Sequence, residues 1–195
     1  MVSELLLLIG ISFSLAFTPG PNNAVASYSG FNFGIKKTIP LILGVGLGYT
    51  ALIILTNFVL ISTFKKFPII QEIIRILGTF FLIYLAYKIA TSHSSQNEKK
   101  ENPVTFFDTF VFQFTNPKGV MAAITLSSKF VQETNYFITS LMVIVVCSIT
   151  AFLSITSWTV LGKFLRKFAT NNSFIKRFNY VMSILILACI IGFYI

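Results

Sequence analysis

Two short polar segments carry the residues in this chain that could bind a ligand, and each interrupts an otherwise apolar stretch. They are Thr18-Pro19-Gly20-Pro21-Asn22-Asn23 and Thr115-Asn116-Pro117-Lys118-Gly119. Hydrocarbon cannot satisfy the backbone N–H and C=O groups that a broken helix exposes, so such breaks persist only against protein, water or a ligand. Breaks at matching positions of two halves of a membrane protein are typical of a transporter's binding site.

The first segment has the composition of a helix break followed by a new helix. Pro19 and Pro21 have no N–H and stop or kink a helix, and the glycine between them lets the backbone turn. Asn22 and Asn23 are good helix N-caps, which predicts a half-helix that begins near Ala24. The free N–H groups and the positive end of such a half-helix favour a carboxylate ligand. A kink that serves only packing is the alternative.

The second segment adds a cation to the same kind of break. Pro117 interrupts the helix, and Asn116 is placed to cap the next half-helix or to line the same cavity. Lys118 lies deep in the apolar stretch, where a lysine costs about 3 kcal/mol or more unless it faces water or a partner. Beside a helix N-terminus it would strengthen the binding of an anion, and the alternative is a lysine that reaches to the membrane interface.

Two further polar residues are candidates in the second half. Gln113 could face the cavity, and Asp108 could carry a proton for coupled transport. The alternative for Asp108 is a place in the first turn of a helix, where its negative charge suits the helix dipole. The predicted substrate site comprises Thr18, Pro19, Gly20, Pro21, Asn22, Asn23, Gln113, Asn116, Pro117 and Lys118.

Composition indicates the elements that position these residues. Of the 195 residues, 55% are hydrophobic and 11% charged, whereas soluble domains carry about 25% charge. With a mean hydropathy of +0.81, the chain is predicted to be an all-α integral membrane protein. Six spans of about 20 residues or more, the length that crosses hydrocarbon, are predicted: 5–33, 38–63, 68–90, 105–128, 136–161 and 176–195.

The spans divide into two halves within a single domain, 1–195. Half-repeat 1 covers about 1–90, a polar linker about 91–104, and half-repeat 2 about 105–195. Three spans in each half predict two inverted three-helix repeats, in which helices 1 and 4 are the broken ones.

The net charge of +9 is distributed as in a membrane protein rather than a nucleic-acid-binding one. Most of the basic residues fall at the connections between spans 1 and 2, 3 and 4, and 5 and 6: Lys36, Lys37, Lys88, Lys99, Lys100, Lys163, Arg166, Lys167, Lys176 and Arg177. The other side has Lys65, Lys66, Arg75 and Lys129. The positive-inside rule then predicts a cytoplasmic linker and both termini outside the cytoplasm.

The sequence shows no enzyme or cofactor motif. It has no metal-ligand spacing, nucleophile–base pair or phosphate loop, so we expect no catalytic residues, no metal and no cofactor. A membrane thiol–disulfide electron carrier would need reactive cysteines near the broken helices, but Cys147 and Cys189 lie in spans 5 and 6. A membrane scaffold without transport activity is a third possibility, and it would leave both breaks unexplained.

At these residues the chain resembles the LysE/RhtB family of bacterial amino-acid exporters. The similar segments are residues 18–22, the stretch from Gly30 to Gly34, the glycines from Gly44 to Gly48, residues 77–88, and Asn116-Pro117-Lys118. Within the family, residues 18–23, 86–92 and 112–114 are most similar to members that export cysteine and O-acetylserine. Lysine-type exporters often carry an acid after the span 2 glycines, where this chain has Tyr49.

The resemblance implies export of small neutral amino acids, of the cysteine and O-acetylserine or homoserine and threonine kind, across the bacterial inner membrane. It also implies alternating access driven by proton motive force. The expected partners are the amino-acid substrate and the lipid bilayer, and the sequence sets no oligomeric state.

Overall fold

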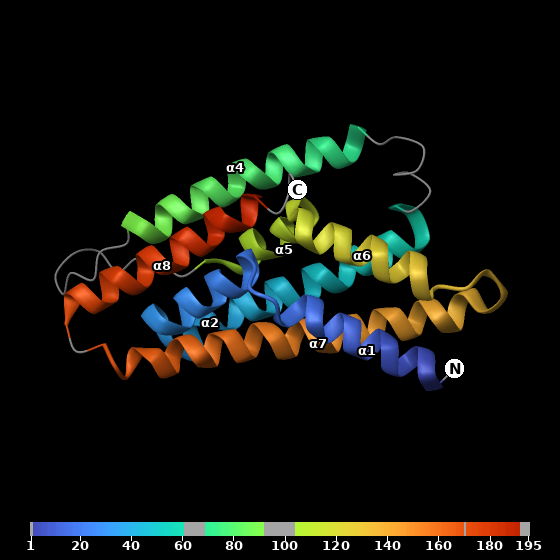
Figure 1. Ribbon diagram of the computed structural model, residues 1–195, viewed down its shortest axis with the longest axis horizontal. Coiled ribbons are helices and arrows are strands. Elements are labelled where there is room, and N and C mark those ends of the chain that lie inside the picture. The colour runs from blue at the N-terminus through green and yellow to red at the C-terminus, as the bar shows by residue number, and fades with distance from the viewer. Residues whose placement is uncertain (1, 61–68, 92–103, 170, 192–195) are drawn as a thin grey trace.

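The computed structural model describes residues 2–60, 69–91, 104–169 and 171–191, and its regular elements there are all helical (Figure 1). They are α1 (Val2–Phe17), α2 (Pro21–Leu55), the π-helical turn η1 (Thr56–Leu60), α4 (Ile69–Thr91), α5 (Phe106–Thr115), α6 (Pro117–Phe130), the 3-10 turn η2 (Glu133–Asn135), α7 (Tyr136–Arg166) and α8 (Asn172–Ile191). The central part of the predicted linker, residues 92–103, lies outside the described residues.

Helical structure is interrupted at both positions that the sequence predicts. The first interruption separates α1, which ends at Phe17, from α2, which begins at Pro21. The second is a single residue, Asn116, between α5 and α6. Since α5 and α6 have 10 and 14 residues, neither alone reaches the length of a membrane span.

The turn between predicted spans 1 and 2 lies inside α2, at Gly34. This residue has φ 76° and ψ 171°, a conformation that essentially only glycine adopts without strain. The chain doubles back here, because the Ser29 and Thr38 hydroxyls are 3.0 Å apart although nine residues separate them. Figure 1 shows α2 running from the middle of the molecule to one end and back.

Glycines allow the helices to approach closely. A side chain at Gly30 would meet the backbone of Thr159, and one at Gly162 the backbone of Ser27, so the first part of α2 packs directly on α7. In the returning part of α2, Gly44 faces Phe106 and Thr109 of α5. These glycines therefore serve helix packing, as small residues do within membranes.

The buried apolar residues form two clusters on either side of the breaks. One cluster joins both parts of α2 to α4, α5, α8 and the second half of α7, and it includes Phe31, Leu82, Ile155 and Phe178. The other joins α1, α6 and the start of α7 to the end of α2. Both interrupted segments are thus held between packed regions.

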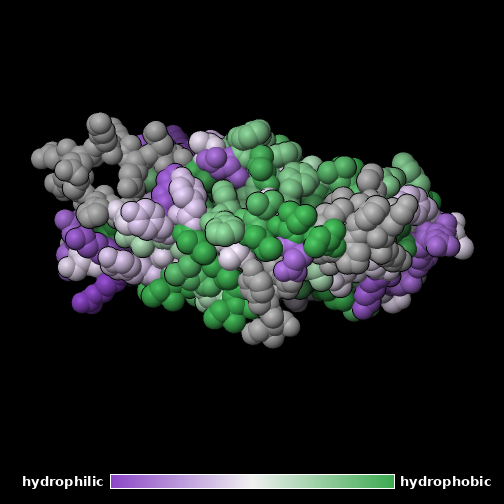
Figure 2. All heavy atoms as spheres, turned by 90° about the horizontal axis from the view of Figure 1, so that it is seen from above, coloured by the Kyte–Doolittle hydropathy of each residue, from purple (hydrophilic) through white to green (hydrophobic). Residues whose placement is uncertain are grey.

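The outer surface is that of an integral membrane protein. Figure 2 shows hydrophobic residues over much of the middle of the molecule and hydrophilic residues toward the two ends. Large apolar side chains such as Phe80, Phe137 and Ile149 are exposed, and an apolar surface of this extent is unfavourable in water. Among the described residues, three helical stretches are long and apolar enough to cross a membrane: Pro21–Phe58, Glu133–Arg166 and Asn172–Ile191. The six-span inverted repeat stays a prediction.

Candidate functional site at the two helix breaks

The first break leaves the last carbonyl groups of α1 without helical partners. Gly20 precedes α2 in an extended conformation, φ −163° and ψ 175°, and Pro21 occupies the first helical position. Proline suits this position because its missing N–H would be unpaired there and its φ is already helical. The chain therefore turns between two helix ends, with carbonyls of α1 on one side and N–H groups of α2 on the other.

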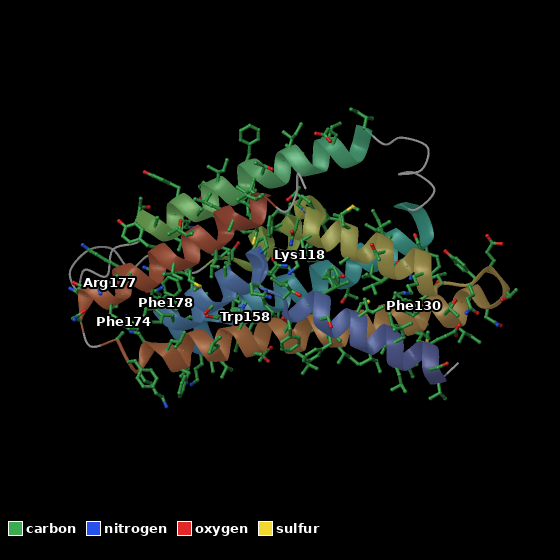
Figure 3. All side chains as sticks on the ribbon, viewed as in Figure 1. Lys118, Phe130, Trp158, Phe174, Arg177 and Phe178 are labelled. Carbon is green, nitrogen blue, oxygen red and sulfur yellow. The ribbon has the colours of Figure 1, made fainter. Side chains whose placement is uncertain are left out.

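Side chains from three helices hold the carbonyls at the end of α1. Asn23 Nδ2 donates to Ala16 O and Thr18 O, at 3.0 Å each, and Ser154 Oγ of α7 donates to Ala16 O at 2.7 Å. Lys118 Nζ of α6 donates to Thr18 O at 2.7 Å and to Pro19 O at 3.3 Å. Figure 3 shows Lys118 in the middle of the molecule, beside the start of α2. A cation from the second break thus neutralises the negative end of the first broken helix.

A pair of side-chain amides links the two breaks a second time. Asn22 Nδ2 donates to Gln113 Oε1 at 2.8 Å, and Gln113 Nε2 donates to Asn22 Oδ1 at 3.2 Å. Gln113 Nε2 also donates to Thr109 O at 2.7 Å. Gln113 is fully buried, and its amide joins α5 to α2.

Asn116 has a buried acceptor with no partner. It links α5 to α6 with φ −83° and ψ 102°, and its side chain does not cap α6. Only 2% of its surface is exposed, and Oδ1 finds no hydrogen-bond partner among the described residues. A buried acceptor left in this state costs about 1–3 kcal/mol, so a ligand that donates to it would stabilise the site.

A cavity of about 70 Å³ lies between the breaks. Its polar side chains come from α1, α2, α6, α7 and the residue that links α5 to α6. They are Ser12, Asn22, Asn23, Tyr49, Asn116, Lys118, Cys147, Thr150 and Ser154. The described residues that line the cavity include a cation but no carboxylate.

The predicted site residues divide between the cavity wall and its support. Six of them line the cavity: Gly20, Pro21, Asn22, Asn23, Asn116 and Lys118. Thr18 and Pro19 supply the carbonyls that Lys118 binds. Gln113 positions Asn22, and Pro117 starts α6 and packs against Gly78 of α4.

The predicted capping role of Asn22 and Asn23 is wrong. The half-helix begins at Pro21 rather than near Ala24, and the residue at its N-cap is Gly20, which has no side chain to bond. Both asparagines lie in the first turn, and their amides reach Gln113 and the end of α1 instead. The backbone N–H groups of this turn precede the first helical bond, which Ala24 N donates to Gly20 O at 3.0 Å.

Asp108 lies outside the cavity lining. Its side chain accepts hydrogen bonds from Thr105 N at 3.2 Å and Thr105 Oγ1 at 2.8 Å, and Asp108 N donates back to Thr105 Oγ1 at 3.2 Å. This reciprocal arrangement is a capping box at the start of α5. The exposed carboxylate therefore has a structural role, and proton coupling through it stays a prediction.

Sequence reasoning missed the contribution of α7. Cys147, Thr150 and Ser154 line the cavity at helical spacing, and Cys147 Sγ lies 3.4 Å from Ser12 Oγ of α1. The signal was a polar stripe, i, i+3, i+7, within an apolar helix. Cys147 and Cys189 are free thiols, and the described residues hold no group of three or more His, Cys, Asp or Glu suited to a metal.

Comparison with known proteins gives one family. A family model described as LysE type translocator matches residues 13–194. A cysteine/O-acetylserine efflux protein of Salmonella typhimurium (strain LT2) is 33% identical over 116 residues, which are 60% of this chain and 60% of that protein. The protein of the same description from Escherichia coli (strain K12) is 30% identical over the same share of each chain. The match thus spans 60% of the length of these curated relatives, and no solved structure matches the chain.

Proposed function

The chain belongs to the LysE type translocator family, and from this premise we propose that it exports small neutral amino acids from the cytoplasm. The family consists of translocators rather than enzymes, and the relatives named above are efflux proteins for cysteine and O-acetylserine. The observation that carries the proposal is the cavity between the two helix breaks, with Lys118 of one break bonded to carbonyls of the other.

The size and charge of the cavity favour a small neutral amino acid. One water needs about 10–15 Å³ of cavity volume, so a cavity of about 70 Å³ has room for about five to seven waters and favours a small amino acid over a bulky one. A basic amino acid would bring a second ammonium group into a lining that holds Lys118 and no carboxylate. The hydroxyls of Ser12, Thr150 and Ser154 suit a short polar side chain.

The carboxylate of the substrate would lie near the first turn of α2 and Lys118. The N–H groups of Asn22 and Asn23 lie at the positive end of a helix, and Lys118 adds a full positive charge from α6. Alternating access would then follow if the half of the molecule with the α1–α2 break rocked against the half with the α5–α6 break, because the cavity lies between the two breaks.

Orientation and energy coupling complete the proposal. We place the chain in the bacterial inner membrane as six spans in two inverted repeats, with both termini outside, and we infer that proton motive force drives export. The bend of α2 lies at the end of the molecule where Figure 3 labels Arg177. Arg166 lies over the ring of Phe31, a residue close to this bend. Basic residues thus lie at this end of the molecule, which supports a cytoplasmic face.

The proposal is tested by profiling the amino acids outside cells that overproduce the chain. The comparison is with Lys118→Ala at an equal membrane level, and with Lys129→Ala as a matched control, because Lys129 lies in the last turn of the same helix and does not line the cavity. We expect a neutral amino acid to accumulate with the wild type and Lys129→Ala but not with Lys118→Ala. Equal profiles for all strains, including one without the protein, would refute export of amino acids.

A further inference from the structure

The carbonyl groups at the end of α1 hold an ammonium group. Lys118 Nζ lies 2.7 Å from Thr18 O and 3.3 Å from Pro19 O. Carbonyls at the C-terminal end of a broken helix are partially negative, and membrane transporters use such groups to bind cations. Lys118 belongs to the second break, and the carbonyls that bind its ammonium group belong to the first break.

A side-chain acceptor in the cavity lining, separate from these carbonyls, has no donor among the described residues. Asn116 lines the cavity two residues before Lys118, its surface is 2% exposed, and its Oδ1 has no hydrogen-bond partner among the described residues. Elsewhere in the lining, Asn23 donates to Ala16 O and Thr18 O, and Ser154 donates to Ala16 O. The unpaired oxygen can accept a hydrogen bond from a ligand, because no described residue donates to it.

We propose that the ammonium group of the transported amino acid binds at the carbonyls of Thr18 and Pro19 and at Asn116 Oδ1, in exchange for the Lys118 ammonium. This inference rests on the proposed function and assigns the amine subsite within it. The freed Lys118 then pairs with the substrate carboxylate. One ammonium replaces another on the carbonyls, so the negative end of α1 is neutralised in the empty and in the loaded site.

The exchange explains why the substrate would need both of its charges. A carboxylate without an amine cannot replace Lys118 on the carbonyls, and an amine without a carboxylate leaves the displaced lysine unpaired within the protein. Either defect leaves a charged or strongly polar group without a partner where solvent is scarce, which is unfavourable. Lys118 thus acts as a selectivity element for zwitterions.

The test removes the Lys118 ammonium group from the carbonyls by mutation and adds a small ammonium ion in solution. Full-length Lys118→Ala, purified in detergent, is heated with methylammonium chloride, and tetramethylammonium chloride serves as the control because it has the same charge but no N–H. We expect methylammonium to raise the Tm of Lys118→Ala by about 2–4 °C over the control salt at several times its dissociation constant. The wild type and Lys129→Ala, whose carbonyls keep Lys118, should show no difference between the salts. Where Lys118→Ala cannot be purified, Lys118→Gln is heated with the same salts. The glutamine side chain is shorter than that of lysine and uncharged, so it satisfies the carbonyls only in part.

A parallel set of samples separates this inference from the proposed function. Wild-type protein is heated with cysteine, O-acetylserine and threonine, and with 3-mercaptopropionate, which is cysteine without its amino group. Stabilisation by an amino acid but not by the acid without the amine supports the exchange. An amino acid that is exported and stabilises the wild type, together with identical effects of the two salts on Lys118→Ala, would overturn the amine subsite and leave the export function standing. A response of Lys118→Ala to methylammonium with no response of the wild type to any amino acid would overturn the exchange and the proposed substrate class together.

Discussion

Gly20→Ala should displace Lys118 without straining the backbone. A Cβ built at Gly20 would lie 2.8 Å from Lys118 Nζ, closer than Cβ atoms approach other atoms, and 3.1 Å from its Cδ, which is a tight contact. The backbone at Gly20 is extended, φ −163° and ψ 175°, a conformation that alanine adopts equally well. The flexible end of the lysine therefore moves rather than the chain.

The cost follows from the hydrogen bonds that the lysine gives up. Bonds to charged groups contribute about 1.5–3 kcal/mol each, but partial exposure of the lysine and its new contacts offset part of the loss. We expect the free energy of unfolding to fall by about 1–2 kcal/mol. Export should fall with it, because the added methyl group also lies in the cavity wall.

The assay is reversible unfolding in mixed micelles, applied to Gly20→Ala, Lys118→Ala and the double variant. In the Lys118→Ala background no ammonium remains to be displaced, so Gly20→Ala should then change the free energy of unfolding by no more than about 0.5 kcal/mol. Gly10→Ala is the matched control: its Cβ would have nothing within 4 Å, and alanine in a helix should stabilise by about 0.5–1 kcal/mol. Equal effects of Gly20→Ala in both backgrounds would refute the contact between Lys118 and the first break.

Three further predictions concern the elements around the cavity. A double-mutant cycle of Asn22→Ala and Gln113→Ala should give a coupling free energy of about 1–2 kcal/mol in unfolding experiments, and additive effects would contradict the amide pair between the breaks. Gly34→Ala should lower the free energy of unfolding by about 1–3 kcal/mol, because φ is 76° there, and a thermal denaturation unchanged from the wild type would contradict the bend. Asp108→Asn should lower the free energy of unfolding by about 1 kcal/mol, because its bonds to Thr105 are weakened, but export in cells should be retained. Loss of export in a stable, membrane-inserted Asp108→Asn protein would instead favour proton coupling through Asp108.

The local chemistry of the breaks was predictable from the sequence. Proline and glycine act through their own backbones, so Pro19, Gly20, Pro21 and Pro117 place the interruptions whatever surrounds them. The turn between the first two spans was also expected near Gly34, although the exact residue depends on its positive φ.

The long-range partners were not predictable from the sequence. Whether Lys118 faces an anion, water or carbonyls depends on how α6 packs against α1, and nothing in the local sequence encodes that contact. The start of α2 was misplaced because Asn22 and Asn23 have strong capping preferences in isolation. In the folded chain their amides bind Gln113 and the end of α1, and the proline at the first helical position sets the boundary instead.

The wall formed by α7 was missed for a related reason. Cys147, Thr150 and Ser154 are isolated in sequence among apolar residues, and each alone is typical of a packed membrane helix. Their spacing places them on one face, but only the position of α7 beside both breaks makes that face part of a cavity.

The most direct test of the account is release of labelled amino acids from proteoliposomes that contain the purified chain. Vesicles are loaded with cysteine, O-acetylserine, threonine or lysine, and an inward proton gradient is imposed. If the substrate binds between the two helix breaks, the wild type and Lys129→Ala accelerate release of a small neutral amino acid but not of lysine, and Lys118→Ala does not. Release by the wild type no faster than from protein-free vesicles for every amino acid, or undiminished release by Lys118→Ala, would contradict a substrate site at the two helix breaks.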